Sequence, residues 1–220
     1  MRKNLQFGED VPGYEIRVLN EREIRAAAGL LFVGTFTAFL LIMTTGNFTP
    51  AKYVLTIFLV DFLLRVLVSP RYAPTLILGR LIVHNQTPEY VGALQKRFAW
   101  TVGLVLSVIM FVFMVVVNAY SPITGIICLL CLLFTFFESA FGICLACKFY
   151  SAVFRKKAQY CPGEVCDVRS RQPIQKTSWA QLFVVLGMAA LLTLFATRFG
   201  GYFSRQPYDL FGITATAKTK

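Results

Sequence analysis

The sequence predicts an all-α polytopic membrane protein with a four-helix core, a fifth transmembrane helix, and one interfacial helix between the second and third spans. Hydrophobic residues make up 56% of the 220 residues and charged residues 15%, which is too apolar for an ordinary soluble domain. Five apolar runs approach the roughly 20 residues that a helix needs to cross the hydrocarbon of a bilayer. Lys and Arg also gather in alternate connections between these runs, as the positive-inside rule requires.

The first apolar run follows a polar amino-terminal arm, residues 1–20, and extends from Ala26 to Met43 without a charge. Asn20 and Glu23 have the spacing of a capping box, which predicts the start of this helix. The arm carries charges of both signs, and no small-residue cleavage pattern accompanies the run. We therefore expect no signal peptide, and the first helix should stay in the mature protein.

The second run, Tyr53 to Leu67, is shorter and contains Asp61 and Arg65. The acid comes four residues before the base, which is the favourable order for an intrahelical ion pair inside the membrane. The mixed segment 69–97 separates this run from the third. Within it, residues 75–84 combine apolar side chains with Arg and His, which predicts a helix lying at the membrane interface.

The last three runs are Phe98 to Val117, Pro122 to Cys147 and Trp179 to Thr197. The run beginning at Pro122 is long enough to cross the bilayer with tilt. The resulting organisation is a polar arm (1–20), a four-helix membrane core (21–155), a cytoplasmic Cys-containing loop (156–178), a fifth transmembrane helix (179–197) and an outer tail (198–220).

The positive charges predict the orientation of these spans. Seventeen of the 22 Lys and Arg residues fall in the amino-terminal segment, the second connection or the fourth connection. The alternation predicts a multi-pass membrane protein, with the amino terminus in the cytoplasm and the carboxyl terminus outside. The net charge of +11 is explained by this topology and by anionic lipid head groups, so we expect a lipid bilayer and no nucleic acid as a partner.

Six cysteines lie within one stretch of the chain: Cys128, Cys131, Cys144, Cys147, Cys161 and Cys166. The first two are surrounded by Leu and Ile and are expected to be small buried hydrophobes. The other four are predicted to lie at the cytoplasmic face, where clustered thiols bind metal or do redox chemistry more often than they form structural disulfides. Incidental, redox and metal-binding roles all stay open.

The metal-binding alternative uses Cys144, Cys147, Cys161 and Cys166 as ligands. Their order, C-x2-C followed by C-x4-C, suits Zn²⁺ or an iron–sulfur cluster. The intervening Pro162-Gly163 pair supplies a turn that brings Cys166 back towards Cys161.

The redox alternative makes Cys144 and Cys147 the catalytic pair, with Glu138 as a proton partner. Its difficulty is that both thiols are predicted at the carboxyl-terminal end of a helix, where the dipole disfavours a thiolate. Glu138 has no neighbour in sequence to neutralise it inside the membrane. A proton or cation relay and a hydrogen bond to a buried hydroxyl are equally good readings of this residue.

Several motifs together resemble those of one bacterial family: Arg17-Val18-Leu19-Asn20, Asp61-Phe62-Leu63-Leu64-Arg65 with Ser69-Pro70, Lys96-Arg97-Phe98-Ala99 with Gly103, and Phe137-Glu138 with Gly142-Ile143-Cys144-Leu145-Ala146-Cys147-Lys148-Phe149-Tyr150. The family consists of small membrane proteins known only as a domain of unknown function. The resemblance covers about residues 17 to 155, and its most specific part is E-x3-G-x-C-x2-C-x2-Y.

The resemblance implies a four-helix core in the inner membrane, with Glu138, Cys144 and Cys147 belonging to the family pattern. It also implies the company of thioredoxin-like or sulfur-transfer proteins. It includes neither the fifth helix nor Cys161 and Cys166. The leading hypothesis is thiol redox chemistry or sulfur handling at the cytoplasmic membrane face. The alternatives are a non-catalytic accessory subunit of a larger membrane complex and a structural Zn or iron–sulfur site.

Overall fold

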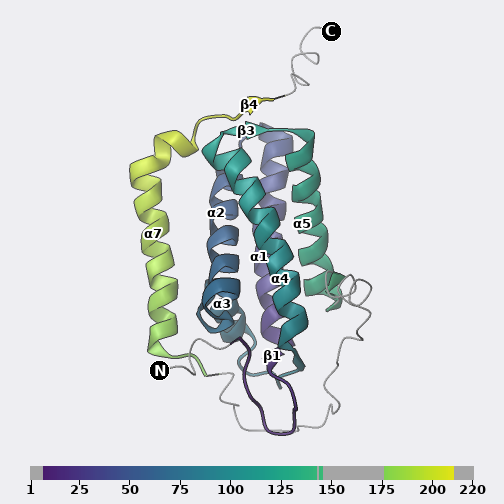
Figure 1. The fold of residues 1–220 in the computed structure, drawn as a ribbon. Helices are drawn as coiled ribbons and strands as arrows, with labels where there is room; N and C mark the ends of the chain where they lie inside the picture. The colour runs from purple at the N-terminus through teal and green to yellow at the C-terminus, as the bar shows by residue number, and fades with distance from the viewer. Residues whose placement is uncertain (1–6, 143, 146–175, 211–220) are drawn as a thin grey trace.

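The computed structural model describes residues 7–142, 144–145 and 176–210, and the account below concerns these residues. Five long helices lie side by side (Figure 1). They are α1 (Glu21–Thr45), α2 (Thr49–Leu63) continued by a π-helix (Leu64–Val68), α4 (Ala93–Phe111) continued by a π-helix (Val112–Val116), α5 (Pro122–Phe141) and α7 (Trp179–Phe203).

The outer surface of the bundle is apolar. In the described part of the chain, α1, α4 with its extension, α5 and α7 are each long and apolar enough to cross a membrane. Their outward side chains include Val33, Leu129 and Phe183, which are 62%, 53% and 68% exposed. Apolar side chains exposed on this scale require lipid rather than water around them. The prediction of a polytopic all-α membrane protein is therefore confirmed.

The two ends of the bundle are closed by short strands and connections (Figure 1). We call one the lower end, where β1 (Val18–Asn20) pairs with β2 (Tyr90–Gly92) and where α3 (Pro74–Ile82) lies. We call the other the upper end, where β3 (Ala119–Tyr120) pairs with β4 (Tyr208–Asp209). A short 3₁₀ helix, Pro70–Tyr72, precedes α3 at the lower end.

The first helix begins earlier than the apolar run that predicted it. Asn20 is the N-cap, and its side chain accepts a hydrogen bond of 3.2 Å from the backbone N–H of Arg22. Its amide also donates to Glu23 Oε1 at 3.1 Å, so the residue expected to complete a capping box contacts the Asn20 side chain instead. The helix ends at Gly46, which has the left-handed conformation common after helix carboxyl termini.

The helix α5 ends six residues before the predicted boundary at Cys147. Gly142 has a φ of 65° and donates its backbone N–H to the carbonyls of Glu138 and Phe137. Glycine adopts this left-handed conformation at little cost, and the two hydrogen bonds satisfy carbonyls that would otherwise lack partners. The prediction that Cys144 lies within this helix is wrong, because the chain has left the helix before reaching it.

The helix predicted at residues 75–84 corresponds to α3. Its buried face packs so tightly on α1 that a Cβ added at Gly79 would lie 2.5 Å from the carbonyl oxygen of Glu23. Its other face exposes Leu78, Leu81 and Ile82. A short helix with one face on the protein and apolar side chains on the other is typical of a position at the membrane surface.

The helix α7 lies at the periphery and contacts α3 and α2 (Figure 1). Among its side chains only Gln181, Met188 and Phe203 are buried. It is attached at both ends: Gln181 Nε2 donates to the carbonyl of Arg71 at 2.8 Å, and the Tyr202 hydroxyl lies 2.7 Å from the carbonyl oxygen of Val115. The arrangement of a four-helix core with an added fifth helix is therefore as predicted.

Candidate functional site

A cluster of charged side chains lies inside the bundle at its lower end. Lys96, on α4, is 2% exposed and lies between two carboxylates from other helices. Its Nζ lies 2.5 Å from Oε1 of Glu138 on α5 and 2.8 Å from Oε2 of Glu21 on α1. Three helices are therefore joined through one ammonium group, and Glu138 is paired with another helix.

Arg25 is a further member of this cluster. It lies on α1, one turn after Glu21, and is close enough to that carboxylate for the two charges to attract each other. A Cβ added at Gly142 would lie 3.2 Å from Nη1 of Arg25, so the guanidinium lies against the end of α5. The cluster thus contains two acids and two bases, whose formal charges balance. A balanced set is the arrangement in which buried charges are least costly.

A second buried polar group lies nearby, where α2 passes into its π-helix. Arg65 Nε donates to Asp61 Oδ2 at 2.7 Å, and the side chains are 3% and 0% exposed. Thr75 at the start of α3 completes the group, since its N–H and its hydroxyl both donate to Asp61, at 2.8 and 2.7 Å. The Arg65 guanidinium lies 4.7 and 4.9 Å from the ring centres of Phe62 and Trp100, within the range of cation–π contacts.

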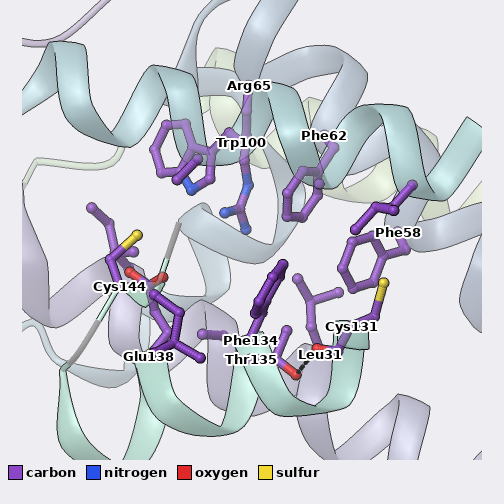
Figure 2. Close-up of a pocket in the computed structure, with 16 residues that line it drawn as sticks. Leu31, Phe58, Phe62, Arg65, Trp100, Cys131, Phe134, Thr135, Glu138 and Cys144 are labelled. Carbon is purple, nitrogen blue, oxygen red and sulfur yellow. Dashed lines mark hydrogen bonds between the residues drawn. The ribbon is translucent and has the colours of Figure 1, made fainter. Parts of the chain in front are cut away.

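A cavity of about 60 Å³ connects these two groups. Its lining includes Arg65, Trp100, Thr135, Glu138, Cys131 and Cys144. Figure 2 shows Cys144 beside Glu138 on one side of the cavity, with Cys131 and Phe58 on the other. Because a water molecule needs at least ~10–15 Å³ of such space and two or more polar partners, the cavity has room for a few waters or one small solute.

Of the three cysteines that the structure describes, Cys144 is the one beside the charged cluster. It lies two residues beyond the Gly142 cap, is half-buried, and is close enough to Lys96 to interact with it electrostatically. A cation beside a cysteine favours the thiolate, which is the reactive form. Cys144 and Glu138 therefore line one small, mostly apolar cavity, and Lys96 lies close to both of them. This set of thiol, carboxylate and ammonium is able to do nucleophilic and proton-transfer chemistry.

The other predicted site residues are distributed differently. Cys128 and Cys131 lie on α5 and are not joined in a disulfide. Cys147, Cys161 and Cys166 lie outside the described residues, so the four-cysteine metal site has only Cys144 within them. In residues 7–142, 144–145 and 176–210, no three His, Cys, Asp or Glu side chains gather as a metal site requires.

Sequence reasoning did not identify Glu21, Arg25, Lys96 or Thr75 as members of a site. Lys96 entered the sequence analysis only as a positive charge in a connection and as part of a family motif, although it stands close to the start of a charge-free run. A signal was present: Glu138 inside a span needed a partner, and a lysine at the start of another span is able to supply one. Which helix supplies it depends on packing between segments far apart in sequence.

The comparisons with known proteins agree with the resemblance seen in the sequence. No curated protein and no solved structure matches the chain. One family model matches residues 19–155, which is more than half of the chain and includes α1 to α5. Glu21, Lys96, Glu138 and Cys144 all fall inside the matched segment, whereas α7 falls outside it. The chain belongs to the family described as Domain of unknown function (DUF4395).

Proposed function

We propose that the protein exchanges thiols and disulfides at the lower end of the bundle, with Cys144 as the attacking thiol and Cys147 as the second thiol of the C-x-x-C pair. The observation that carries this proposal is the position of Cys144, which lines the same cavity as Glu138 and Arg65 and lies close to Lys96. A cysteine beside a cation is more reactive than one packed among aliphatic side chains, because the cation favours the thiolate.

Each neighbour of Cys144 has a role in this proposal. The Lys96 ammonium stabilises the thiolate, and the Glu138 carboxylate takes up and returns the proton of the thiol. The end of α5 at Gly142 reduces the difficulty raised by the helix dipole, because Cys144 is not part of the last helical turn. Thiol–disulfide exchange depends on both the thiolate fraction and access to the attacking sulfur.

The proposed reaction has two steps. The Cys144 thiolate attacks one sulfur of a partner's disulfide, which forms a mixed disulfide and releases the partner's other sulfur as a thiolate that takes up a proton. The Cys147 thiolate then attacks the Cys144 sulfur. This second step forms the Cys144–Cys147 disulfide and releases the partner as a dithiol, so two electrons pass from the C-x-x-C pair to the partner.

The partner in this proposal is a thioredoxin-like protein, and the site faces the cytoplasm from the inner membrane. Support for this side comes from the distribution of Lys and Arg, which favours an inside amino terminus and an outside carboxyl terminus. Glutathione disulfide is small enough to approach the same site and is a useful second substrate.

Trapping of the mixed disulfide tests the proposal. The Cys147→Ser variant, incubated with oxidised thioredoxin, should accumulate a covalent adduct that a reductant releases, because the second step cannot occur. The Cys144→Ser, Cys147→Ser double variant should form none. The matched control is Cys128→Ser, which keeps the C-x-x-C pair, changes a residue that does not line the cavity of the site and should exchange at the wild-type rate. Wild-type exchange by the Cys144→Ser, Cys147→Ser variant would overturn the proposal.

A further inference from the structure

A second, larger cavity of about 470 Å³ occupies the upper half of the bundle. Its walls come from α1, α2, α4 and α5, with Tyr120 and Ser121 at its upper end. Phe58 and Cys131 line both this cavity and the smaller one below. The upper cavity therefore reaches from the end of the bundle to its middle, where these two side chains separate it from the charged site.

Among the described residues that line this upper cavity, none has a charged side chain. Three of the hydroxyls that line it already donate to the backbone: Thr35 to the carbonyl of Leu31, Ser107 to that of Leu104, and Thr124 to that of Ser121, all at 2.7 to 2.8 Å. A ligand inside would consequently meet few hydrogen-bond donors. Aliphatic, aromatic and methionine side chains form the remaining surface, including Phe39, Met43, Leu55, Met110 and Met114.

The upper end of the cavity is more polar than its interior. Gln206, which follows α7, lines the cavity and is exposed, and Tyr120 is half-buried there. An amphiphile would thus find apolar walls in the bundle and polar groups where the bundle ends. The volume falls within the range of about 300–1,000 Å³ that is usual for small-molecule sites.

We propose that the upper cavity binds the hydrocarbon chain of a membrane amphiphile, with the polar part of that molecule at the upper end beside Tyr120 and Gln206. The chain is either the acyl chain of a phospholipid or the isoprenoid chain of a quinone. Both are apolar hydrocarbons and match the apolar walls of the cavity. This site uses residues other than those of the proposed thiol chemistry, so either proposal can fail without the other.

Gly125 offers a position on the cavity wall where a larger side chain has free space around it. It lies in the first turns of α5 and lines the cavity, and a Cβ added there would meet nothing within 4 Å. Gly187 on α7 is a matched control, because it is equally exposed, its Cβ also meets nothing within 4 Å, and it lies away from the cavity. Leu and Phe substitutions at each position provide added side chains of two sizes.

The first experiment measures binding of cis-parinaric acid, a fluorescent fatty acid, to the purified protein in mild detergent. Wild type and Gly187→Phe should bind it saturably with equal affinity. Gly125→Leu should bind more weakly, and Gly125→Phe at least ten-fold more weakly. Because Leu fills less of the cavity, it keeps the test decisive if the Phe variant is poorly folded. Equal binding by Gly125→Leu and Gly187→Leu, or binding that never saturates, would overturn the proposal.

The second experiment identifies the source of the chain. Protein purified from membranes is extracted with organic solvent, and phospholipid and quinone are quantified by mass spectrometry. One of them should co-purify with wild type and with Gly187→Phe, and should fall at least several-fold in Gly125→Phe. A fall in phospholipid assigns an acyl chain, and a fall in quinone assigns an isoprenoid chain. If neither falls, the cavity does not hold a hydrocarbon chain.

Discussion

Two buried lysines show how the ends of the bundle differ. At the lower end, Lys96 lies between the carboxylates of Glu21 and Glu138. At the upper end, Lys52 is also buried, but the partners that the structure gives it are neutral: Asn118 Oδ1 at 2.7 Å and the carbonyl oxygen of Arg205 at 2.5 Å. The lower end is held by charges that depend on one another, and the upper end by hydrogen bonds around an apolar cavity.

The space around the glycines differs between the two ends of the bundle in the same way. Near the lower end, Gly79 lies against the backbone of α1, and Gly103 lies so close to the Phe62 ring that a Cβ would collide with it. In the upper half, a Cβ at Gly125 or Gly46 would meet nothing within 4 Å. Close packing holds α3 against α1 and α4 against α2 near the lower end, whereas the open upper half leaves space for a ligand. The following predictions test that difference.

Replacing each lysine should have the largest effect and the clearest asymmetry. Lys96→Met removes the buried ammonium that lies between the Glu21 and Glu138 carboxylates, which should lower the free energy of unfolding by about 3–5 kcal/mol. Lys52→Met removes hydrogen bonds from a charged group to neutral acceptors and should cost about 1.5–3 kcal/mol. Unfolding in mixed micelles, followed by circular dichroism during SDS titration, measures both. Equal losses would contradict the assignment of a charge cluster to the lower end alone.

Close packing between α3 and α1 should make Gly79 intolerant of even a methyl group. Gly79→Ala places a Cβ 2.5 Å from the Glu23 carbonyl oxygen and 3.1 Å from the Ala27 nitrogen, both backbone atoms. The resulting overpacking should cost about 1–3 kcal/mol in the same SDS titration. Gly187→Ala is the control and should not destabilise the protein. A tolerated Gly79→Ala would show that α3 is not held tightly against α1.

The two left-handed glycines at helix ends provide a matched pair. Gly46 and Gly142 have nearly the same φ, 67° and 65°. Alanine at either position should cost about 1–2 kcal/mol for the left-handed backbone. Gly142→Ala should cost more than Gly46→Ala, because its Cβ also presses on the Arg25 guanidinium at 3.2 Å. If the two variants unfold at the same SDS concentration, the contact between Arg25 and the end of α5 contributes nothing.

The smallest expected effect is a gain in stability rather than a loss. Gly125→Ala improves the helix propensity of α5 without a steric conflict, because the added Cβ meets nothing within 4 Å. The variant should be more stable than wild type by up to about 1 kcal/mol in SDS titration. A destabilised Gly125→Ala would mean that this part of α5 is packed against another segment, and the upper cavity would then be smaller than described.

The fold follows from the sequence to a large extent because lipid imposes a simple requirement. A helix that crosses hydrocarbon must be long, apolar and free of unpaired charge, so the runs from Ala26, Phe98 and Trp179 predicted α1, α4 and α7. The ends of the helices were less predictable. Apolar composition continues past Gly142, and only the backbone conformation of that glycine reveals where α5 stops.

The candidate site was predictable only in part. Glu138 and Cys144 stand out because an acid in a span and a clustered thiol are unusual in any apolar sequence. Lys96 and Glu21 do not stand out, since charged residues near the ends of spans are ordinary topological signals. Lys96 pairs with both Glu138 and Glu21 because of how α1, α4 and α5 pack, and these two partners lie 42 and 75 positions from it in the sequence.

The measurement that tests the account most directly is the pH dependence of Cys144 alkylation. In protein with the other five cysteines changed to Ser, the rate of maleimide labelling at Cys144 should rise with pH as the thiolate forms. Glu138→Gln removes a neighbouring negative charge and should move the midpoint of that rise to lower pH. Ser139→Ala, one residue along α5, is the control and should leave the midpoint unchanged. An unchanged midpoint in Glu138→Gln would show that Cys144 is not coupled to the charged cluster and would contradict the account.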